Sequence, residues 1–223
     1  MSIARNLQQK INTNKAKISV LGLGYVGLPV AFSFAKKFEV LGFDINKKRI
    51  LELKKFKDKN HSVSFENFKK KKIFFSFKKK NLINSEIFII TTPTPITENK
   101  KPDLKYIFKA LDLIIKSNIY GKLIILESTV FPGASNNVFI KYLEKKTNLK
   151  INKDFLFGYS PERINPGDNT NKFKNISKIV SGSSKRSCNL IFKLYKKVVN
   201  KVYKSSSILA AETAKLIENS QRD

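Results

Sequence analysis

The chain has 223 residues, of which 41% are hydrophobic, so it can bury a substantial core as one large domain or as a domain with a fragment of another. No run of the sequence reaches the ~18 apolar residues of a membrane helix, and the polar N-terminus lacks the apolar core of a signal peptide. A single cysteine excludes an internal disulfide. We therefore expect a soluble, cytoplasmic protein with no membrane partner. The net charge of +27 comes mostly from lysines spread along the chain, which indicates A/T-rich codon usage and weak attraction to polyanions rather than a specific nucleic-acid partner, for which arginine is the preferred residue.

Apolar runs alternate with helical stripes along the chain. We expect strands at 17–22, 38–44, 72–77, 86–93, 122–129, 154–162 and 176–182, and helices at 26–37, 46–55, 103–116, 135–146, 184–198 and 210–223. Ser135 is expected to cap the helix that begins there. Residues 54–72 are polar and lysine-rich, which predicts a loop with room for one helical turn. The only histidine, His61, has no neighbouring ligand residues in that loop, so we expect no metal site there.

The predicted strands are mostly continuous apolar runs, which is typical of strands buried on both faces. Their alternation with helices predicts an α/β fold with a mostly parallel sheet and helices on both sides. Ligands of such sheets bind outside the carboxyl ends of the strands. The residues expected at that edge are 22–27, Asp44, 91–95, 127–129 and 160–162.

Three glycines stand between the first strand and the first helix. Gly22, Gly24 and Gly27 form G-x-G-x-x-G, and Asp44 lies 22 residues after Gly22, close to the ~20 expected for the acid that binds the adenosine ribose. The helix N-terminus would receive the pyrophosphate, and an acid at this position favours NAD over NADP because it repels a 2′-phosphate. The alternative is a glycine turn without a ligand, with Asp44 capping the next helix.

Five segments in order resemble the UDP-glucose/GDP-mannose dehydrogenase family. They are "GLGYVGLPVA" (22–31), "TPTPI…PDL" (92–104), "ESTVFPGAS" (127–135), "SPERINPGD" (160–168) and "AAETAKLIENSQRD" (210–223). The fourth is most similar to the branch that oxidises UDP-N-acetylhexosamines. The resemblance implies a Rossmann-like, doubly wound NAD-binding domain at 1–207, the start of a long central helix at 208–223, and a UDP-sugar substrate whose C6 alcohol is oxidised to a carboxylate with two NAD⁺.

The resemblance also implies roles for individual residues. Thr129 would position water, Glu162 would act as the general base, and Lys215 and Asn219, four apart on one helix, would hold the oxygen at C6. Without the resemblance, a surface pair would explain the last two equally well. Arg163, Ile164 and Asn165 would contact the substrate together with Glu162, Lys215 and Asn219. The implied cofactor-binding residues are Gly22, Gly24, Tyr25, Val26, Gly27, Asp44, Arg49, Thr94, Pro95 and Thr129.

The chain departs from the family pattern in one respect that bears on activity. The family's catalytic cysteine lies beyond the lysine-bearing helix, whereas Cys188 precedes it in a helical pattern without a glycine run, so we expect no catalytic role for Cys188. The family dimerises through the central helix and has a second α/β domain. We therefore expect an N-terminal half that is inactive alone, completed by a C-terminal half from a separate chain or left as a non-catalytic NAD-binding remnant. UDP-glucose oxidation stays open as an alternative.

Overall fold

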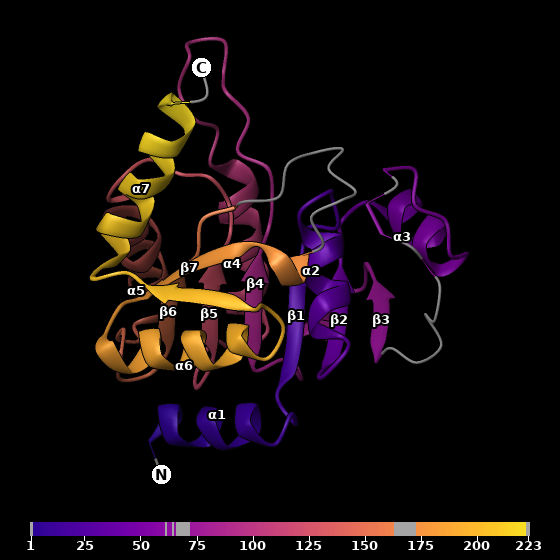
Figure 1. The fold of residues 1–223 in the computed structure, drawn as a ribbon, viewed down its shortest axis with the longest axis horizontal. Coiled ribbons are helices and arrows are strands. Elements are labelled where there is room, and N and C mark those ends of the chain that lie inside the picture. Colours follow the sequence, from indigo (N-terminus) through magenta and orange to yellow (C-terminus); the bar gives the residue numbers. More distant parts are fainter. Residues whose placement is uncertain (1, 61, 64, 66–71, 163–172, 222–223) are drawn as a thin grey trace.

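The computed structural model describes residues 2–60, 62–63, 65, 72–162 and 173–221, which form a sheet with helices on both faces (Figure 1). The strands are β1 (Lys17–Leu21), β2 (Glu39–Phe43), β3 (Ile73–Ser76), β4 (Ile87–Ile90), β5 (Leu123–Leu126), β6 (Leu156–Tyr159), β7 (Ser177–Gly182) and β8 (Lys201–Lys204). The helices are α1 (Ile3–Asn12), α2 (Gly27–Phe34), α3 (Lys47–Lys54), α4 (Lys105–Lys116), α5 (Lys141–Thr147), α6 (Lys185–Lys196) and α7 (Ile208–Ser220). Shorter turns are η2 (Lys79–Leu82), η3 (Ser135–Ile140) and η4 (Phe173–Asn175).

The strand order is β3-β2-β1-β4-β5-β6-β7-β8. Strands β1 to β6 are parallel, β7 is antiparallel to β6, and β8 is parallel to β7. This order confirms the predicted doubly wound α/β fold, because β2 and β3 are added on one side of β1, whereas β4 and the strands after it are added on the other side. Figure 1 shows β8 running across the direction of β4, β5 and β6. Within the described ranges, no helix has the length and apolar character needed to cross a membrane.

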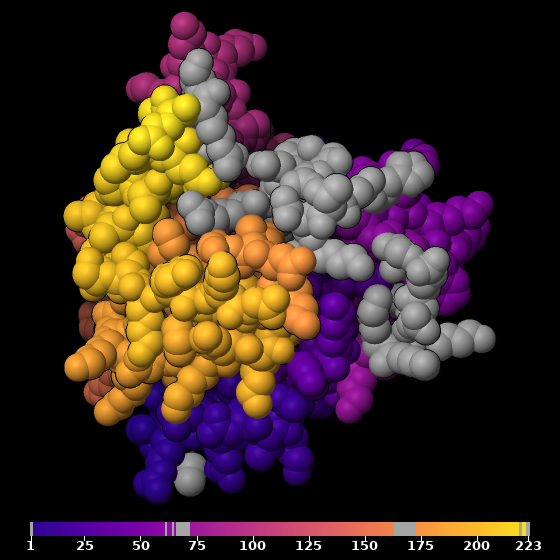
Figure 2. All heavy atoms as spheres, in the orientation of Figure 1, coloured from indigo at the N-terminus to yellow at the C-terminus, as the bar shows by residue number. Residues whose placement is uncertain are grey.

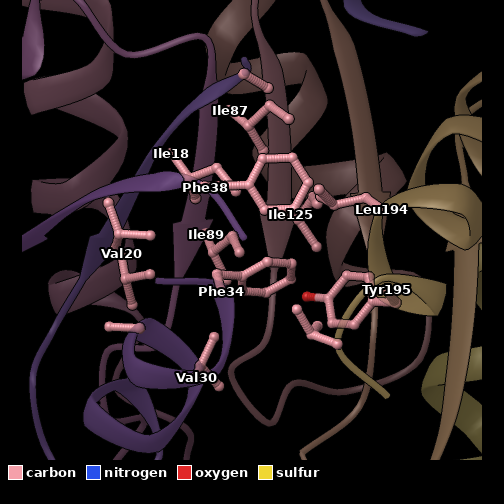
Figure 3. Close-up of a cluster of buried hydrophobic side chains, with 14 of the residues drawn as sticks. Ile18, Val20, Val30, Phe34, Phe38, Ile87, Ile89, Ile125, Leu194 and Tyr195 are labelled. Atoms are coloured by element: carbon pink, nitrogen blue, oxygen red, sulfur yellow. The ribbon is translucent and has the colours of Figure 1, made fainter. Parts of the chain in front are cut away.

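Two apolar layers enclose the sheet. Helices α1, α2, α3 and α6 cover one face, and helices α4, α5 and α7 cover the other. The first layer is rich in aromatic rings: Phe34 of α2 meets Tyr195 of α6 edge to face, with ring centroids 5.3 Å apart (Figure 3). Because both faces are buried, the central strands β4 and β5 are apolar at every position, as their sequence predicts.

The predicted strands and helices are all present, with ends within three residues of those predicted when η3 and α5 together are taken as the helix predicted at 135–146, but one further helix and one strand were missed. Helix α1 buries only Ala4, Leu7 and Ile11, a stripe diluted by polar neighbours, and it packs against α6 at the lower end of the molecule (Figures 1 and 2). Strand β8 buries Val202 alone. One buried residue cannot show the alternation of buried and exposed positions that marks a strand, so the sequence carries little signal for this edge strand.

The predicted cap at Ser135 is wrong. Ser135 is the first residue of the π-helix η3, and its buried Oγ makes no hydrogen bond with the described residues. Glu212 of α7 supplies the cap instead: its two carboxylate oxygens accept from the backbone N–H groups of Gly133 and Ser135, at 2.6 and 2.9 Å. The orphan N–H groups of the helix start are therefore satisfied by a residue more than 70 positions away, which also attaches α7 to the sheet domain.

Candidate functional site

A pocket of about 580 Å³ lies at the carboxyl edge of the sheet. Its walls come from the turn after β1, from the ends of β2, β4 and β5, from α4, and from the segment after β6. The lining residues are Leu21, Gly22, Leu23, Gly24, Tyr25, Val26, Phe43, Asp44, Ile45, Thr91, Thr92, Pro93, Thr94, Tyr106, Lys109, Ala110, Leu113, Glu127, Ser128, Thr129 and Glu162. Its position is the one that the strand pattern predicts for a ligand.

The glycine turn forms one wall of this pocket, and its three glycines have different roles. Gly22 has φ +97°, a conformation that side chains rarely adopt. A Cβ on Gly27 would lie 1.8 Å from the carbonyl oxygen of Gly22, so only glycine lets the start of α2 pack against the end of β1. A Cβ on Gly24 would meet nothing within 4 Å. Since Gly24 lines the pocket, the space beside it is available to a ligand.

Asp44 and Arg49 hold the turn from the side of β2. Oδ2 of Asp44 accepts from the N–H of Leu23 at 2.8 Å, and Nε of Arg49 donates to the carbonyl of Leu23 at 3.0 Å. Asp44 does not cap α3, as the alternative interpretation required, because the side chain of Asn46 occupies that position and accepts from the N–H of Arg49. Asp44 therefore sits in the pocket wall with one carboxylate oxygen against the glycine turn.

The guanidinium of Arg49 points away from the pocket. Its NH1 and NH2 groups pair with Glu52 at 3.2 Å and with Asp58 at 2.7 Å, and Arg49 does not line the pocket. Burial of Asp58 tends to raise its pKa, but hydrogen bonds from Ser62 and Arg49 outweigh that effect and hold the pKa below its usual value. In the described structure, Arg49 thus supports the turn from behind, and its predicted contact with a cofactor stays a prediction.

Hydroxyl groups join the loops that follow β4 and β5. Thr94 donates to the carbonyl of Thr129 at 2.8 Å, and Ser128 donates to the carbonyl of Thr92 at 2.6 Å. Thr94 and Thr129 both line the pocket, whereas Pro95 lies outside the lining; their predicted contacts with the cofactor stay predictions. These two hydrogen bonds fix the Thr129 backbone beside the pocket and leave its side chain exposed toward the solvent.

A buried ion pair adjoins the pocket, because one of its two residues, Glu127, belongs to the lining. Glu127, at the end of β5, pairs with Lys178 of β7 at 2.6 Å and accepts a hydrogen bond from the hydroxyl of Tyr195 on α6. Both charged side chains are almost completely buried. Lys178 also donates to the carbonyl of Pro161 at 3.2 Å, next to Glu162, which lines the pocket. The ion pair therefore connects three elements to the segment that carries Glu162.

Of the remaining predicted residues, only Lys215 has a described side chain, and it does not line the pocket. Lys215 lies on α7, largely buried, with Nζ 3.8 Å from Glu218, and it is not among the lining residues. Asn219 belongs to α7, but its side chain lies outside the described part of the chain. The predictions for Arg163, Ile164, Asn165 and His61 also fall outside the described residues, as does part of the predicted loop at 54–72. In the described ranges, no group of His, Cys, Asp or Glu is arranged to hold a metal ion.

Helix α4 supplies a wall that sequence reasoning missed. Tyr106, Lys109, Ala110 and Leu113 line the pocket, at spacings of three, one and three residues. These spacings define a helical face next to the one that packs in the core through Ile107, Leu111 and Ile114. The available signal was that Tyr106, Ala110 and Leu113 add further apolar positions to this helix.

Cys188 lies on α6 and is not among the residues that line the pocket. Its Sγ is 3.9 Å from the carbonyl oxygen of Val180. Burial raises the pKa of the thiol, and the nearby Lys204 offsets only part of this effect. A raised pKa leaves less thiolate at neutral pH, which is the opposite of what a nucleophile requires.

We therefore expect Cys188 to be alkylated slowly near neutral pH. Because the folded thiol ionises at a higher pH than a free one, the midpoint of the rate profile with iodoacetamide should lie above that of the same protein unfolded in urea. Mass spectrometry of the alkylated protein over a pH series measures both profiles. A midpoint below that of the unfolded protein would show an activated thiol and contradict this expectation.

Comparison with known proteins gives a consistent result. Residues 16–206 match the UDP-glucose/GDP-mannose dehydrogenase family, NAD binding domain. The chain is 46% identical over 209 residues to the UDP-N-acetyl-D-glucosamine 6-dehydrogenase of Pseudomonas aeruginosa, covering 93% of this chain and 50% of that protein. Protein CapL of Staphylococcus aureus is 44% identical over 207 residues, covering 92% of this chain and 49% of that protein.

Solved structures agree with the sequence comparison. The structure of a UDP-D-ManNAc dehydrogenase from Pyrococcus horikoshii aligns with a TM-score of 0.81 at 32% identity, over 92% of this chain and 50% of that one. An NDP-N-acetyl-D-galactosaminuronic acid dehydrogenase from Methanosarcina mazei aligns with a TM-score of 0.86 at 28% identity, over 100% of this chain and 50% of that one. The chain thus spans about half the length of the relatives it matches.

Proposed function

Because the chain belongs to the UDP-glucose/GDP-mannose dehydrogenase family, we propose that it is the NAD-binding half of an enzyme that oxidises the C6 hydroxyl of a UDP-N-acetylhexosamine to the uronate. Two relatives, at 46% and 42% identity, are UDP-N-acetyl-D-glucosamine 6-dehydrogenases, which supports this branch over UDP-glucose oxidation. The observation that carries the proposal is the pocket itself, because Gly24, Asp44, Thr129 and Glu162 line one cavity.

The residues of the pocket fit NAD. The open space beside Gly24 would admit the pyrophosphate at the N-terminus of α2. Each carboxylate oxygen of Asp44 accepts one backbone N–H, from Leu23 or Asn46. Since a carboxylate oxygen has two lone pairs, both oxygens keep the capacity to accept from the ribose hydroxyls. When bound, NAD would serve as the hydride acceptor.

The catalytic residues would come from two sides of the site. Thr129 and Glu162 share the pocket, where the hydroxyl would position water and the carboxylate would take a proton. Lys215 and Asn219, on α7, would stabilise the developing charge on the C6 oxygen. Arg163, Ile164 and Asn165 would contact the sugar nucleotide. Oxidation of the alcohol to the acid consumes two NAD⁺ and one water. Holding the intermediate would require a thiol nucleophile, and the described residues that line the pocket include no cysteine.

The proposal also includes the assembly. We infer that residues 1–207 form the NAD-binding domain and that α7 begins the central helix, through which the family dimerises. A C-terminal half, encoded with this chain or separately, would supply the cysteine and the rest of the UDP-sugar site. The cytoplasmic location stays a prediction.

Residues 1–223 expressed alone are expected to make no uronate, because the second half supplies both the nucleophile and the binding energy that positions the reacting carbon. The same residues joined to the uncovered half of the P. aeruginosa relative are expected to oxidise UDP-GlcNAc. NADH formation, with the product identified by mass, measures both. Lys215→Ala should abolish the activity of the joined protein. Lys116→Ala, on the exposed end of α4, is the matched control.

Two outcomes would contradict the proposal. Sustained uronate formation by residues 1–223 alone would show that the chain carries its own nucleophile. The Cys188→Ser variant would then test whether that nucleophile is Cys188. A joined protein that is folded and binds NADH, but oxidises none of UDP-GlcNAc, UDP-GalNAc or UDP-glucose, would indicate a non-catalytic NAD-binding chain.

A further inference from the structure

We propose that Thr91 is a positioning residue of the cofactor site, whose buried hydroxyl fixes the peptide between Gly22 and Leu23 in the orientation that receives the dinucleotide. Thr91 follows β4 directly and is 7% exposed. Its role is distinct from that of the three glycines, because it acts on the turn from the neighbouring strand.

The hydroxyl of Thr91 continues the sheet ladder by one residue. The N–H of Thr91 donates to the carbonyl of Leu21 at 2.9 Å, the last regular bond between the two strands. Its Oγ1 lies 3.0 Å from that same carbonyl and 2.8 Å from the carbonyl of Gly22, so the hydroxyl proton is shared between them. Strand β1 ends at Leu21, so the hydroxyl supplies the donor for the first carbonyl beyond the strand.

Thr91 and Asp44 hold opposite ends of one peptide plane. The carbonyl of Gly22 and the N–H of Leu23 belong to the same rigid amide unit. Thr91 donates to the carbonyl end, and Asp44 accepts from the N–H end at 2.8 Å. If the carbonyl end were released, the plane could rotate, and Asp44 would lose the partner that orients its carboxylate in the pocket.

The packing around this peptide leaves it little freedom while Thr91 is in place. A Cβ on Gly22 would lie 3.0 Å from the carbonyl oxygen of Thr91, and a Cβ on Gly27 would lie 2.4 Å from Oγ1 of Thr91. The turn, the start of α2 and Thr91 are therefore in mutual contact. Because the hydroxyl donates to protein carbonyls, it acts on the cofactor through the turn.

Three variants separate positioning from general stability. Thr91→Val keeps the shape of the side chain and removes the donor, and Thr91→Ser keeps the donor. Ser117→Ala is the matched control, because Ser117 is also buried and donates to a backbone carbonyl, that of Ile114, at 2.8 Å, but lies at the far end of α4 and outside the pocket. Two quantities are measured on each: the dissociation constant of NADH by fluorescence titration, and amide hydrogen exchange of residues 22–28 without cofactor.

Thr91→Val is expected to weaken NADH binding by about fivefold or more, the equivalent of one lost hydrogen bond, and to speed exchange in residues 22–28. Thr91→Ser should stay within about twofold of the wild type, and Ser117→Ala should change neither quantity beyond its effect on global unfolding. Wild-type affinity and exchange in Thr91→Val, or a Thr91→Ser variant as impaired as Thr91→Val, would overturn the proposal. If the wild-type chain binds no NADH, the cofactor assignment fails, and exchange in residues 22–28 alone decides the role of Thr91.

Discussion

Gly24→Ala is expected to weaken NADH binding by roughly 10- to 100-fold while the protein stays as stable as the wild type. The added methyl group meets no protein atom within 4 Å, so it costs no packing energy in the free protein. It would occupy the space in which the pyrophosphate approaches the backbone, and forcing a methyl group into a close contact costs about 1–3 kcal/mol.

Gly27→Ala is the matched comparison. Its Cβ would lie 1.8 Å from the carbonyl oxygen of Gly22 and 2.4 Å from Oγ1 of Thr91, so α2 has to move away from the sheet. We expect a loss of about 3 kcal/mol or more in the free energy of unfolding. Urea unfolding and NADH titration of both variants measure the two effects. Wild-type affinity in Gly24→Ala would place the cofactor elsewhere than over this turn.

Lys178→Met is expected to reduce the free energy of unfolding by about 3–5 kcal/mol, because it leaves the carboxylate of Glu127 buried without its cation. The ion pair is 2.6 Å long, and the side chains of Lys178 and Glu127 are 1% and 0% exposed, so the pair is shielded from solvent in the folded protein. Tyr195 still donates one hydrogen bond to Glu127, which limits the damage. Urea unfolding at constant pH measures the difference.

Two further variants test that reason. Adding Glu127→Gln to Lys178→Met removes the uncompensated charge and should recover a large part of the lost stability. Lys105→Met is the control: it removes the cation of an ion pair with Asp103, 3.1 Å long, on the exposed start of α4, and should change stability little. If the double variant is no more stable than Lys178→Met, then volume or shape, not charge, explains the loss.

The cofactor turn could be predicted from the sequence because its determinants lie close together in the chain. Gly22, Gly24 and Gly27 are contiguous with the strand and the helix that they join, and Asp44 ends the next strand. The central strands are equally predictable, because a strand buried on both faces is apolar at every position. These local patterns place the pocket at the correct edge of the sheet.

The features that sequence reasoning missed depend on residues far apart in the chain. Glu212 caps the start of η3, where it accepts from the N–H groups of Gly133 and Ser135, and Glu127 pairs with Lys178, 51 residues later. Nothing in the sequence near Ser135 shows that a distant glutamate replaces its hydroxyl as the cap. Likewise, the contact of Arg49 with the glycine turn could not be predicted without knowing the fold, because a basic residue on a surface helix usually faces the solvent.

The most direct test of the cofactor assignment is a titration of residues 1–223 with NADH and NADPH, followed by fluorescence. The wall formed by Asp44 and the glycine turn predicts saturable binding of NADH, with NADPH weaker by about tenfold or more because its 2′-phosphate would face the carboxylate of Asp44. Equal affinity for the two cofactors, tighter binding of NADPH, or no binding of NADH would contradict this account.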